Sequence, residues 1–437
     1  MKRKAMEQLI TWKEQTNRSV LLMEGIKGVG KTYLAIDFAK SFYPDYLYLN
    51  FENKPDAVAL LTKKILAGEE FTYMLSTYFH VPEELLYQSL LIFDEVSFCP
   101  TFCKAVLQYS AAFYEAREQQ PEFAQTGLKM VLLSSISLKD YMLEDIDRAL
   151  ATGMSFVPLY PLSFDEFLMA FGTDWYIETI QAHFQNRRPI PDILHQDLLG
   201  LFEEYLMVGG MPAAMNEYMQ MGSAVNLPEI HRMQLAHMAS VLKRQYPEGD
   251  VLKAHQVLQN IPTQLAKPNH KFQFNLIRKG TSYNMYKDSI QLLTDNGIVL
   301  RLNARKNEQA FKLYLPDTGI LYSLLPKEEW CLPDGEEMSL KNKKALLENY
   351  IMQELAAHEE YQVFFWESKS QAKLEFVLRN EQGNIPLELR VEEHKHSKSL
   401  NVYMNTHTCP YALRISAKNF NTTDTIKNVP YYAIFCL

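Results

Sequence analysis

The stretch that decides the fold runs from Val20 to Lys40 and reads VLLMEGIKGVGKTYLAIDFAK. Its first four residues form a short apolar run that suits a buried strand, and its last part, without Pro or Gly, suits a helix. The glycine-rich loop GIKGVGKT, Gly25–Thr32, lies between them. A strand, such a loop and a helix in this order are the context that a phosphate-binding loop requires. The stretch therefore predicts an α/β domain that holds a nucleotide.

Each residue type in the loop has a physical task. Glycines tolerate positive φ and carry no side chain, so backbone N–H groups can crowd around a phosphate. The helix that follows presents its N-terminal dipole to the same anion. The lysine is expected to reach the β- and γ-phosphates, and the threonine hydroxyl is expected to bind magnesium. The predicted ATP-binding residues are Gly25, Ile26, Lys27, Gly28, Val29, Gly30, Lys31 and Thr32.

A second element supports a magnesium nucleotide. Residues 90–93 form an apolar run that ends in Asp94-Glu95, some 60 residues after the loop. An acidic pair at the carboxyl end of a buried strand lies at the ligand edge of an α/β sheet. We expect Asp94 to hold magnesium through water and Glu95 to polarise the attacking water.

Three further strands follow the same rhythm, at residues 46–51, 129–133 and 156–160. Strands that alternate with helices predict a mostly parallel, doubly wound sheet. Ser134 and Ser135 follow the second of these strands, and Ser135 could sense the γ-phosphate from a neighbouring strand. A small polar strand end with no such task explains the pair as well.

Composition excludes several classes of protein. Hydrophobic residues make up 47% and charged residues 22% of the 437 residues, the balance of a folded protein with two or three domains. No apolar run is long enough to span a bilayer, and no signal peptide is visible. We therefore expect a cytoplasmic protein that does not associate with a membrane. The five cysteines show neither a disulfide framework nor a zinc set, and we expect ordinary buried thiols.

The net charge of −8 is unevenly distributed. Residues 231–320 hold 13 Lys and Arg against 6 Asp and Glu, or +7, whereas residues 1–230 hold 18 against 30, or −12. The middle block contains an expected helix at 282–296 and an expected hairpin at 298–315, which together suggest a winged helix. It could contact DNA or instead dock a protein or act as a lid. The cations considered for DNA are Arg278, Lys279, Lys287, Arg301, Arg305 and Lys306.

Four segments together resemble a known family. They are RKAMEQLITWKEQTNRSVLLMEGIKGVGKTYLAIDFAK, SLLIFDEVSFCP, VPLYPLSFDEFLMAFG and YLMVGGMPAAMNEYM. The chain looks like a prokaryotic group of AAA-type ATPases whose C-terminal domain of unknown function resembles the PD-(D/E)XK nuclease fold. The resemblance implies the roles given above to Lys31, Thr32, Asp94 and Glu95. It also implies an α/β P-loop domain at 1–225, a winged-helix-like domain at 226–325 and a restriction-nuclease-like α/β domain at 326–437.

The chain departs from the family in places. Ser134-Ser135 replaces the usual Gly-Ser, and no arginine finger is identifiable, with Arg117 and Arg148 candidates by location only. In the C-terminal domain an arginine takes the place of the nuclease lysine, and an arginine cannot act as a base. Lys373 stands where a glutamate is common. The matching positions are Glu348, Glu375, Glu388 and Arg390.

Three functions remain open at this point. The first is an ATPase whose hydrolysis switches the attached domains, and the second is a nucleic-acid-binding regulator in which ATP sets only the conformation. The third is an ATP-gated nuclease, which the departures disfavour relative to a degenerate nuclease fold used for binding or for a protein partner. His394 and His396 fit a solvated loop better than a metal site.

Overall fold

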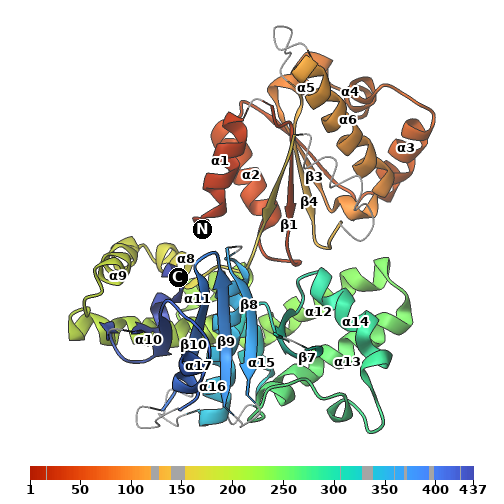
Figure 1. The fold of residues 1–437 in the computed structure, drawn as a ribbon. Helices are drawn as coiled ribbons and strands as arrows, with labels where there is room; N and C mark the ends of the chain where they lie inside the picture. Colours follow the sequence, from red (N-terminus) through yellow and green to blue (C-terminus); the bar gives the residue numbers. More distant parts are fainter. Residues whose placement is uncertain are drawn as a thin grey trace. The chain divides into compact units, whose positions relative to one another are not determined.

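The computed structural model describes residues 1–437 except 16, 120–126, 139–152, 306, 327–337, 359, 369–371, 393–397 and 424. The described chain forms two compact units, Lys2–Tyr160 and Pro161–Leu437 with Met1. Each unit has its own sheet (Figure 1). The three-domain boundaries expected from the sequence stay a prediction.

The first unit is built on a five-stranded sheet in the order β2-β3-β4-β1-β5, in which every neighbouring pair is parallel. The predicted doubly wound parallel sheet is therefore confirmed. Figure 1 shows α1 and α2 on one side of the strands and α3 to α6 on the other. Its elements are α1 Ala5–Glu14, β1 Val20–Glu24, α2 Lys31–Phe42, β2 Tyr46–Asn50, α3 Pro55–Leu66, α4 Phe71–Phe79, α5 Glu83–Gln88, β3 Leu90–Asp94, η1 Val96–Phe98, α6 Pro100–Gln119, β4 Lys129–Ser134 and β5 Met154–Pro158.

Strand β4 lies between β1 and β3, although it follows both in the sequence. The carboxyl ends of parallel strands meet at one edge of a sheet. The order of the strands therefore brings the residues after β4 between the phosphate-binding loop, which follows β1, and the acidic pair, which follows β3.

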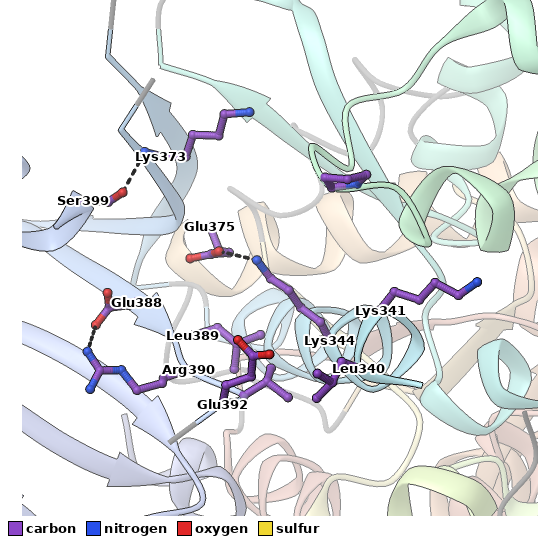
Figure 2. A pocket seen from close by; sticks show the side chains of 12 residues that line it. Leu340, Lys341, Lys344, Lys373, Glu375, Glu388, Leu389, Arg390, Glu392 and Ser399 are labelled. Carbon is purple, nitrogen blue, oxygen red and sulfur yellow. Dashed lines mark hydrogen bonds and ion pairs between the residues drawn. The ribbon is translucent and has the colours of Figure 1, made fainter. Parts of the chain in front are cut away.

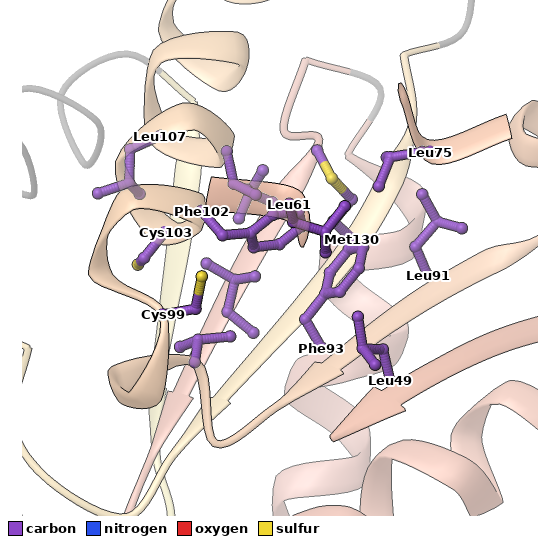
Figure 3. Packing of buried hydrophobic residues seen from close by; sticks show 14 of the residues in the cluster. Leu49, Leu61, Leu75, Leu91, Phe93, Cys99, Phe102, Cys103, Leu107 and Met130 are labelled. Atoms are coloured by element: carbon purple, nitrogen blue, oxygen red, sulfur yellow. The ribbon is translucent and has the colours of Figure 1, made fainter. Parts of the chain in front are cut away.

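An apolar cluster packs one face of this sheet against α3, α4, α5 and α6 (Figure 3). The rings of Phe93 and Phe102 lie 4.6 Å apart at its centre. Cys99 and Cys103 are buried in the same cluster and form no disulfide, which confirms the prediction of ordinary buried thiols for this pair. Cys331 lies outside the described residues. Because Leu91 and Phe93 of β3 are buried in this cluster, the packing fixes the position of Asp94 and Glu95 at the end of the strand.

The second unit contains an eight-stranded sheet in the order β12-β13-β11-β10-β9-β8-β6-β7. The predicted hairpin of the middle block is present as β6 and β7, and β6 joins β8 in parallel through Ala304 and Phe365. The sheet thus runs from the middle block into the C-terminal region. The strands are β6 Leu300–Ala304, β7 Asn307–Tyr314, β8 Gln362–Glu367, β9 Lys373–Asn380, β10 Gly383–Leu389, β11 Ala412–Ser416, β12 Asn421–Thr422 and β13 Ile426–Pro430.

Most helices of the second unit precede this sheet in the sequence, and α15, α16 and α17 lie between its strands in the sequence. The predicted helix over 282–296 is present as α14. The helices are α8 Phe164–Ala170, α9 Asp174–Asn186, α10 Asp192–Val208, α11 Pro212–Met221, α12 Leu227–Gln245, α13 Glu248–Leu265, η3 Phe274–Leu276, α14 Tyr283–Asp295, α15 Thr318–Leu324, α16 Leu340–Ala356, α17 Ser399–Thr406 and η5 Tyr431–Cys436.

Candidate nucleotide-binding site

The glycine-rich loop connects the end of β1 to the first residue of α2, as the sequence predicts. Gly28 and Gly30 have φ of 86° and 104°, which disfavour any residue with a side chain. Gly25 has a different reason to be glycine, because a Cβ there would lie 2.3 Å from the carbonyl oxygen of Leu159. The loop therefore has the tight backbone that lets N–H groups converge on a phosphate.

Lys31 lies beneath this loop and is 5% exposed. Its ammonium donates to the carbonyl oxygens of Gly25, at 2.7 Å, and Ile26, at 3.3 Å, and to Ser135 Oγ at 2.9 Å. Burial lowers the pKa of Lys31 to about 8, against the opposing charges of Glu95 and Asp94. The carbonyl oxygens satisfy the ammonium here, and a bound phosphate oxygen is a stronger acceptor that can replace them.

Asp94 ends β3 and accepts three hydrogen bonds on one carboxylate oxygen. Thr32 Oγ1 donates to Asp94 Oδ2 at 2.8 Å, the hydroxyl of Tyr48 at 2.7 Å and the amide of Asn50 at 3.1 Å. The other oxygen, Asp94 Oδ1, is buried without a partner among the described residues. A buried carboxylate oxygen without a donor costs free energy, and a hydroxyl with a carboxylate is the donor set that magnesium prefers. Thr32 and Asp94 therefore fit the magnesium of Mg·ATP.

Glu95 adopts the left-handed backbone conformation, with φ of 53°, and is 3% exposed. Its Oε1 accepts from Ser135 Oγ at 2.5 Å and from the ammonium of Lys27 at 2.8 Å, and its Oε2 accepts from the Ser135 N–H at 3.2 Å. Burial alone would raise the pKa of Glu95, but the charges of Lys31 and Lys27 outweigh it and hold that pKa below its usual value. Glu95 is therefore a carboxylate that can accept a proton from water.

The structure brings the predicted nucleotide-site residues together at one edge of the sheet. Ser135 joins Lys31 to Glu95, so the residue considered as a γ-phosphate sensor contacts both predicted catalytic groups. The side chain of Arg117 and the whole of Arg148 lie outside the described residues, so neither candidate arginine is placed.

Sequence reasoning missed the contribution of β2 and the side chain of Lys27. Tyr48 and Asn50 on β2 bind Asp94, and Glu52, just after β2, binds Lys27 at 2.5 Å. The register pairs Asn50 with Asp94, so the polar end of β2 was the available signal. Lys27 was expected only to contribute backbone to the loop.

The C-terminal acidic positions lie near a pocket of about 460 Å³, which Lys341, Lys344, Lys373, Glu375, Glu388 and Arg390 help to line. Figure 2 shows the Lys344 ammonium directed at Glu375, and Arg390 directed at Glu388. The distances are 2.7 Å from Lys344 Nζ to Glu375 Oε1 and 3.4 Å from Arg390 to Glu388 Oε2, which Arg414 also binds at 2.9 Å. Each of these two carboxylates is thus paired with a cation of the chain.

Glu348, on α16, is fully buried beneath this region. Its Oε2 binds His270 at 2.8 Å, the hydroxyl of Tyr314 at 3.0 Å and the ammonium of Lys312 at 3.3 Å. Burial would raise the pKa of Glu348, but the charges of Lys312 and His270 hold it well below its usual value. Among the described residues no group of three or more His, Cys, Asp and Glu is arranged to hold a metal ion. His394 and His396 lie outside them.

Residues 17–168, which contain the whole of this nucleotide site, match the family described as AAA domain. These residues therefore form an AAA domain within the chain. In the rest of the chain, residues 199–330 and residues 343–434 match two domains of unknown function, DUF8612 and DUF4143. The comparison with curated proteins gives no match.

Several solved structures are similar to the chain. A Walker-type ATPase of Pyrococcus abyssi is 15% identical, with a TM-score of 0.43 over 74% of this chain and 95% of that chain. The ORC2 protein of Aeropyrum pernix is 14% identical, with a TM-score of 0.33 over 71% and 88%. The ORC1 protein of the same organism, in complex with DNA, is 15% identical, with a TM-score of 0.29 over 74% and 90%.

Within the described parts of the chain, no helix combines the length and the apolar character needed to cross a membrane.

Proposed function

We propose that the chain hydrolyses Mg·ATP at the site between residues 25 and 135 and uses the cycle to switch residues 161–437. The observation that carries the proposal is the arrangement of Glu95. Its ionised carboxylate lies at the same sheet edge as the phosphate-binding loop and is linked through Ser135 to Lys31. This is the arrangement in which a carboxylate can accept a proton from water that attacks a terminal phosphate.

In this mechanism the loop N–H groups bind the phosphates, and Lys31 exchanges its carbonyl acceptors for phosphate oxygens. Glu95 orients water for in-line attack on the γ-phosphate and accepts its proton. Ser135 holds Glu95 through its Oγ and its N–H, which keeps the carboxylate in place while charge develops. Magnesium, when bound at Thr32 and Asp94, supplies neutralisation of the charge on the β- and γ-phosphates.

The test is phosphate release from ATP by the full chain, beside Lys31→Ala and Glu95→Gln. We expect Lys31→Ala to lose both ATP binding and turnover, and Glu95→Gln to bind ATP normally while losing turnover at least a hundredfold. Glu95→Gln turning over at the rate of the unchanged protein would refute the assigned role of Glu95. Tight ATP binding without turnover in the unchanged protein would leave a nucleotide-dependent regulator as the function.

For the partner we propose a polyanion, DNA, contacted by the segment 231–320. The support is that Arg278, Lys279 and Lys287 are exposed on the stretch from η3 to α14 within a block of charge +7. The guanidinium of Arg301 stacks on Phe311, 4.5 Å from the ring centre, so this cation already has a contact within the protein. Duplex DNA added to the phosphate-release assay should raise turnover, whereas indifference to DNA would favour a protein partner.

For the DUF4143 region we propose binding or assembly in place of DNA cleavage. The support is that Glu375 and Glu388 are paired with Lys344, Arg390 and Arg414, because cations already beside the carboxylates oppose the binding of a metal ion. Incubation of plasmid DNA with the protein, magnesium and ATP should leave it uncut. Cutting that Glu375→Ala abolishes would establish the ATP-gated nuclease.

A further inference from the structure

Lys27, in the middle of the glycine-rich loop, lies between two carboxylates from two different strands. Its ammonium is 2.5 Å from Glu52 Oε2, just after β2, and 2.8 Å from Glu95 Oε1, just after β3. The side chain of Lys27 is 28% exposed, and that of Glu95 is 3% exposed. The loop side chain therefore binds the very carboxylate to which water activation is assigned above.

The charges explain why a cation is needed at this point. Glu95 is buried at the edge of the sheet where a triphosphate binds, and a carboxylate beside phosphates is repelled unless positive charge separates them. Ser135 fixes the position of Glu95 through two neutral donors, whereas Lys27 supplies charge as well as a hydrogen bond. Glu52 in turn holds the Lys27 ammonium from its other side.

The backbone conformation of Glu95 also requires neighbouring groups that hold the residue in place. A residue with a side chain is strained in the left-handed region, and such a conformation persists only where its surroundings hold it. Here the surroundings are the bonds to Ser135 and Lys27. Loss of the Lys27 bond would leave the Glu95 carboxylate hydrogen-bonded only to the neutral donors of Ser135, with Lys31 as the nearby charge.

We propose that Lys27 is a positioning residue for ATP hydrolysis, which holds the Glu95 side chain in place, and that Glu52 orients Lys27 for this task. The inference rests on the proposed ATP hydrolysis. Lys27 acts through Glu95, so its side chain governs the rate of the chemical step, whereas the loop backbone and Lys31 govern nucleotide binding.

The experiment measures kcat, KM and the ATP dissociation constant for Lys27→Met, Lys27→Arg and Glu52→Gln. Lys27→Met should lose kcat at least tenfold with an ATP dissociation constant changed less than threefold. Lys27→Arg keeps the charge and should recover most of kcat, and Glu52→Gln should lose less than Lys27→Met. The matched control is Lys64→Met, which removes the 2.8 Å ion pair to Glu69 after α3 and should leave kcat unchanged.

Three results would overturn the inference: a normal kcat in Lys27→Met, losses of kcat and ATP affinity in equal proportion, or Lys27→Arg no better than Lys27→Met. A normal kcat in Glu95→Gln would instead contradict the proposed function. A second measurement needs no turnover, namely the unfolding midpoints of Lys27→Met, Glu95→Gln and the double variant without nucleotide. The two shifts should not add, and strictly additive shifts would show that the two side chains are uncoupled.

Discussion

Asp94 gives its two carboxylate oxygens different surroundings. Three donors converge on Oδ2, while Oδ1 is buried without a donor in the described structure. A motif in the sequence identifies Asp94 as an acid at a strand end, but it cannot show which oxygen is left for a ligand. That asymmetry follows from Tyr48 and Asn50, which the neighbouring strand supplies.

Magnesium dependence tests this asymmetry. Thr32→Ala and Asp94→Asn should each raise the magnesium concentration for half-maximal turnover at least tenfold. The first removes a hydroxyl oxygen, and the second replaces a charged carboxylate by a neutral amide, which attracts a hard cation less strongly. Chelation of magnesium should abolish turnover of the unchanged protein. Tyr48→Phe, which removes a hydrogen bond to Asp94 but no ligand, is the matched control and should cause the smallest shift. Equal shifts in all three variants would contradict the assigned ligands.

His231 on α12 gives the second unit a dependence on pH. The side chain is fully buried, with Nε2 against the carbonyl of Val208, and burial lowers the pKa of His231 to about 4. The unfolded state takes up a proton as pH falls below about 6.5, while the folded state does so only near 4. The free energy of unfolding should thus fall by up to about 3 kcal/mol between these values. Urea unfolding of His231→Gln should show a flatter pH profile.

Asp317 has the opposite effect in an overlapping range. Its carboxylate is buried and accepts from the N–H groups of Gly210 and Ile320, and burial raises the pKa of Asp317 to about 6. The folded state therefore holds this proton up to a higher pH than the unfolded state, and stability falls as pH rises from about 4 to 6. Asp317→Asn has no such titrating group, so its free energy of unfolding should rise more steeply than that of the unchanged protein as pH rises from about 4 to 6. An unchanged slope would show that Asp317 is ionised throughout.

At the scale of the element, the sequence predicted most of the strands but not their order. The apolar runs at 20–23, 46–51, 90–93 and 129–133 became β1 to β4, because buried parallel strands leave an uninterrupted hydrophobic run. The fifth expected strand, 156–160, begins two residues earlier in the structure, at Met154. Local patterns carry no information on which strand neighbours which.

The strand order is what the site depends on. Ser135 contacts Lys31 and Glu95 because β4 lies between β1 and β3. The sequence supported a sensor at Ser135 and a plain strand end equally, and the sensor role of Ser135 stays a prediction. The Lys27 and Glu52 pair was beyond prediction for the same reason, since it joins a loop to the end of β2.

The helix α6 is anchored to β3 by Phe102, which is fully buried against Phe93. Phe102→Ala should lower the free energy of unfolding by about 3–5 kcal/mol, because the space left by the ring is only partly filled. It should also weaken turnover more than ATP binding, since Glu95 directly follows β3. Leu66→Ala, at a side chain 77% exposed, is the control and should be close to neutral. Urea unfolding and the phosphate-release assay check both statements.

At the scale of the whole molecule, a net charge of −8 hides a segment of +7. If that segment meets DNA, the logarithm of the binding constant falls with the logarithm of salt concentration in proportion to the phosphates neutralised. Replacing Arg278, Lys279 and Lys287 by Ala should reduce that slope by up to about 3. The control replaces Lys40, Lys54 and Lys104, exposed cations of the first unit, and should leave the slope unchanged. An unchanged slope in the first triple variant would remove the segment from the DNA interface.

The eight-stranded sheet of the second unit contains strands from both the middle block and the C-terminal region, so a fragment that separates the two would divide the sheet. A protein that stops at residue 325 would keep β6 but lose β8, its parallel neighbour, and would present a bare strand edge that invites self-association. The same cut would remove Glu348, leaving Lys312 and His270 without the carboxylate to which both bind. A fragment with the basic segment alone should thus be prone to aggregation, and experiments on its ligands are better made with residues 161–437 intact.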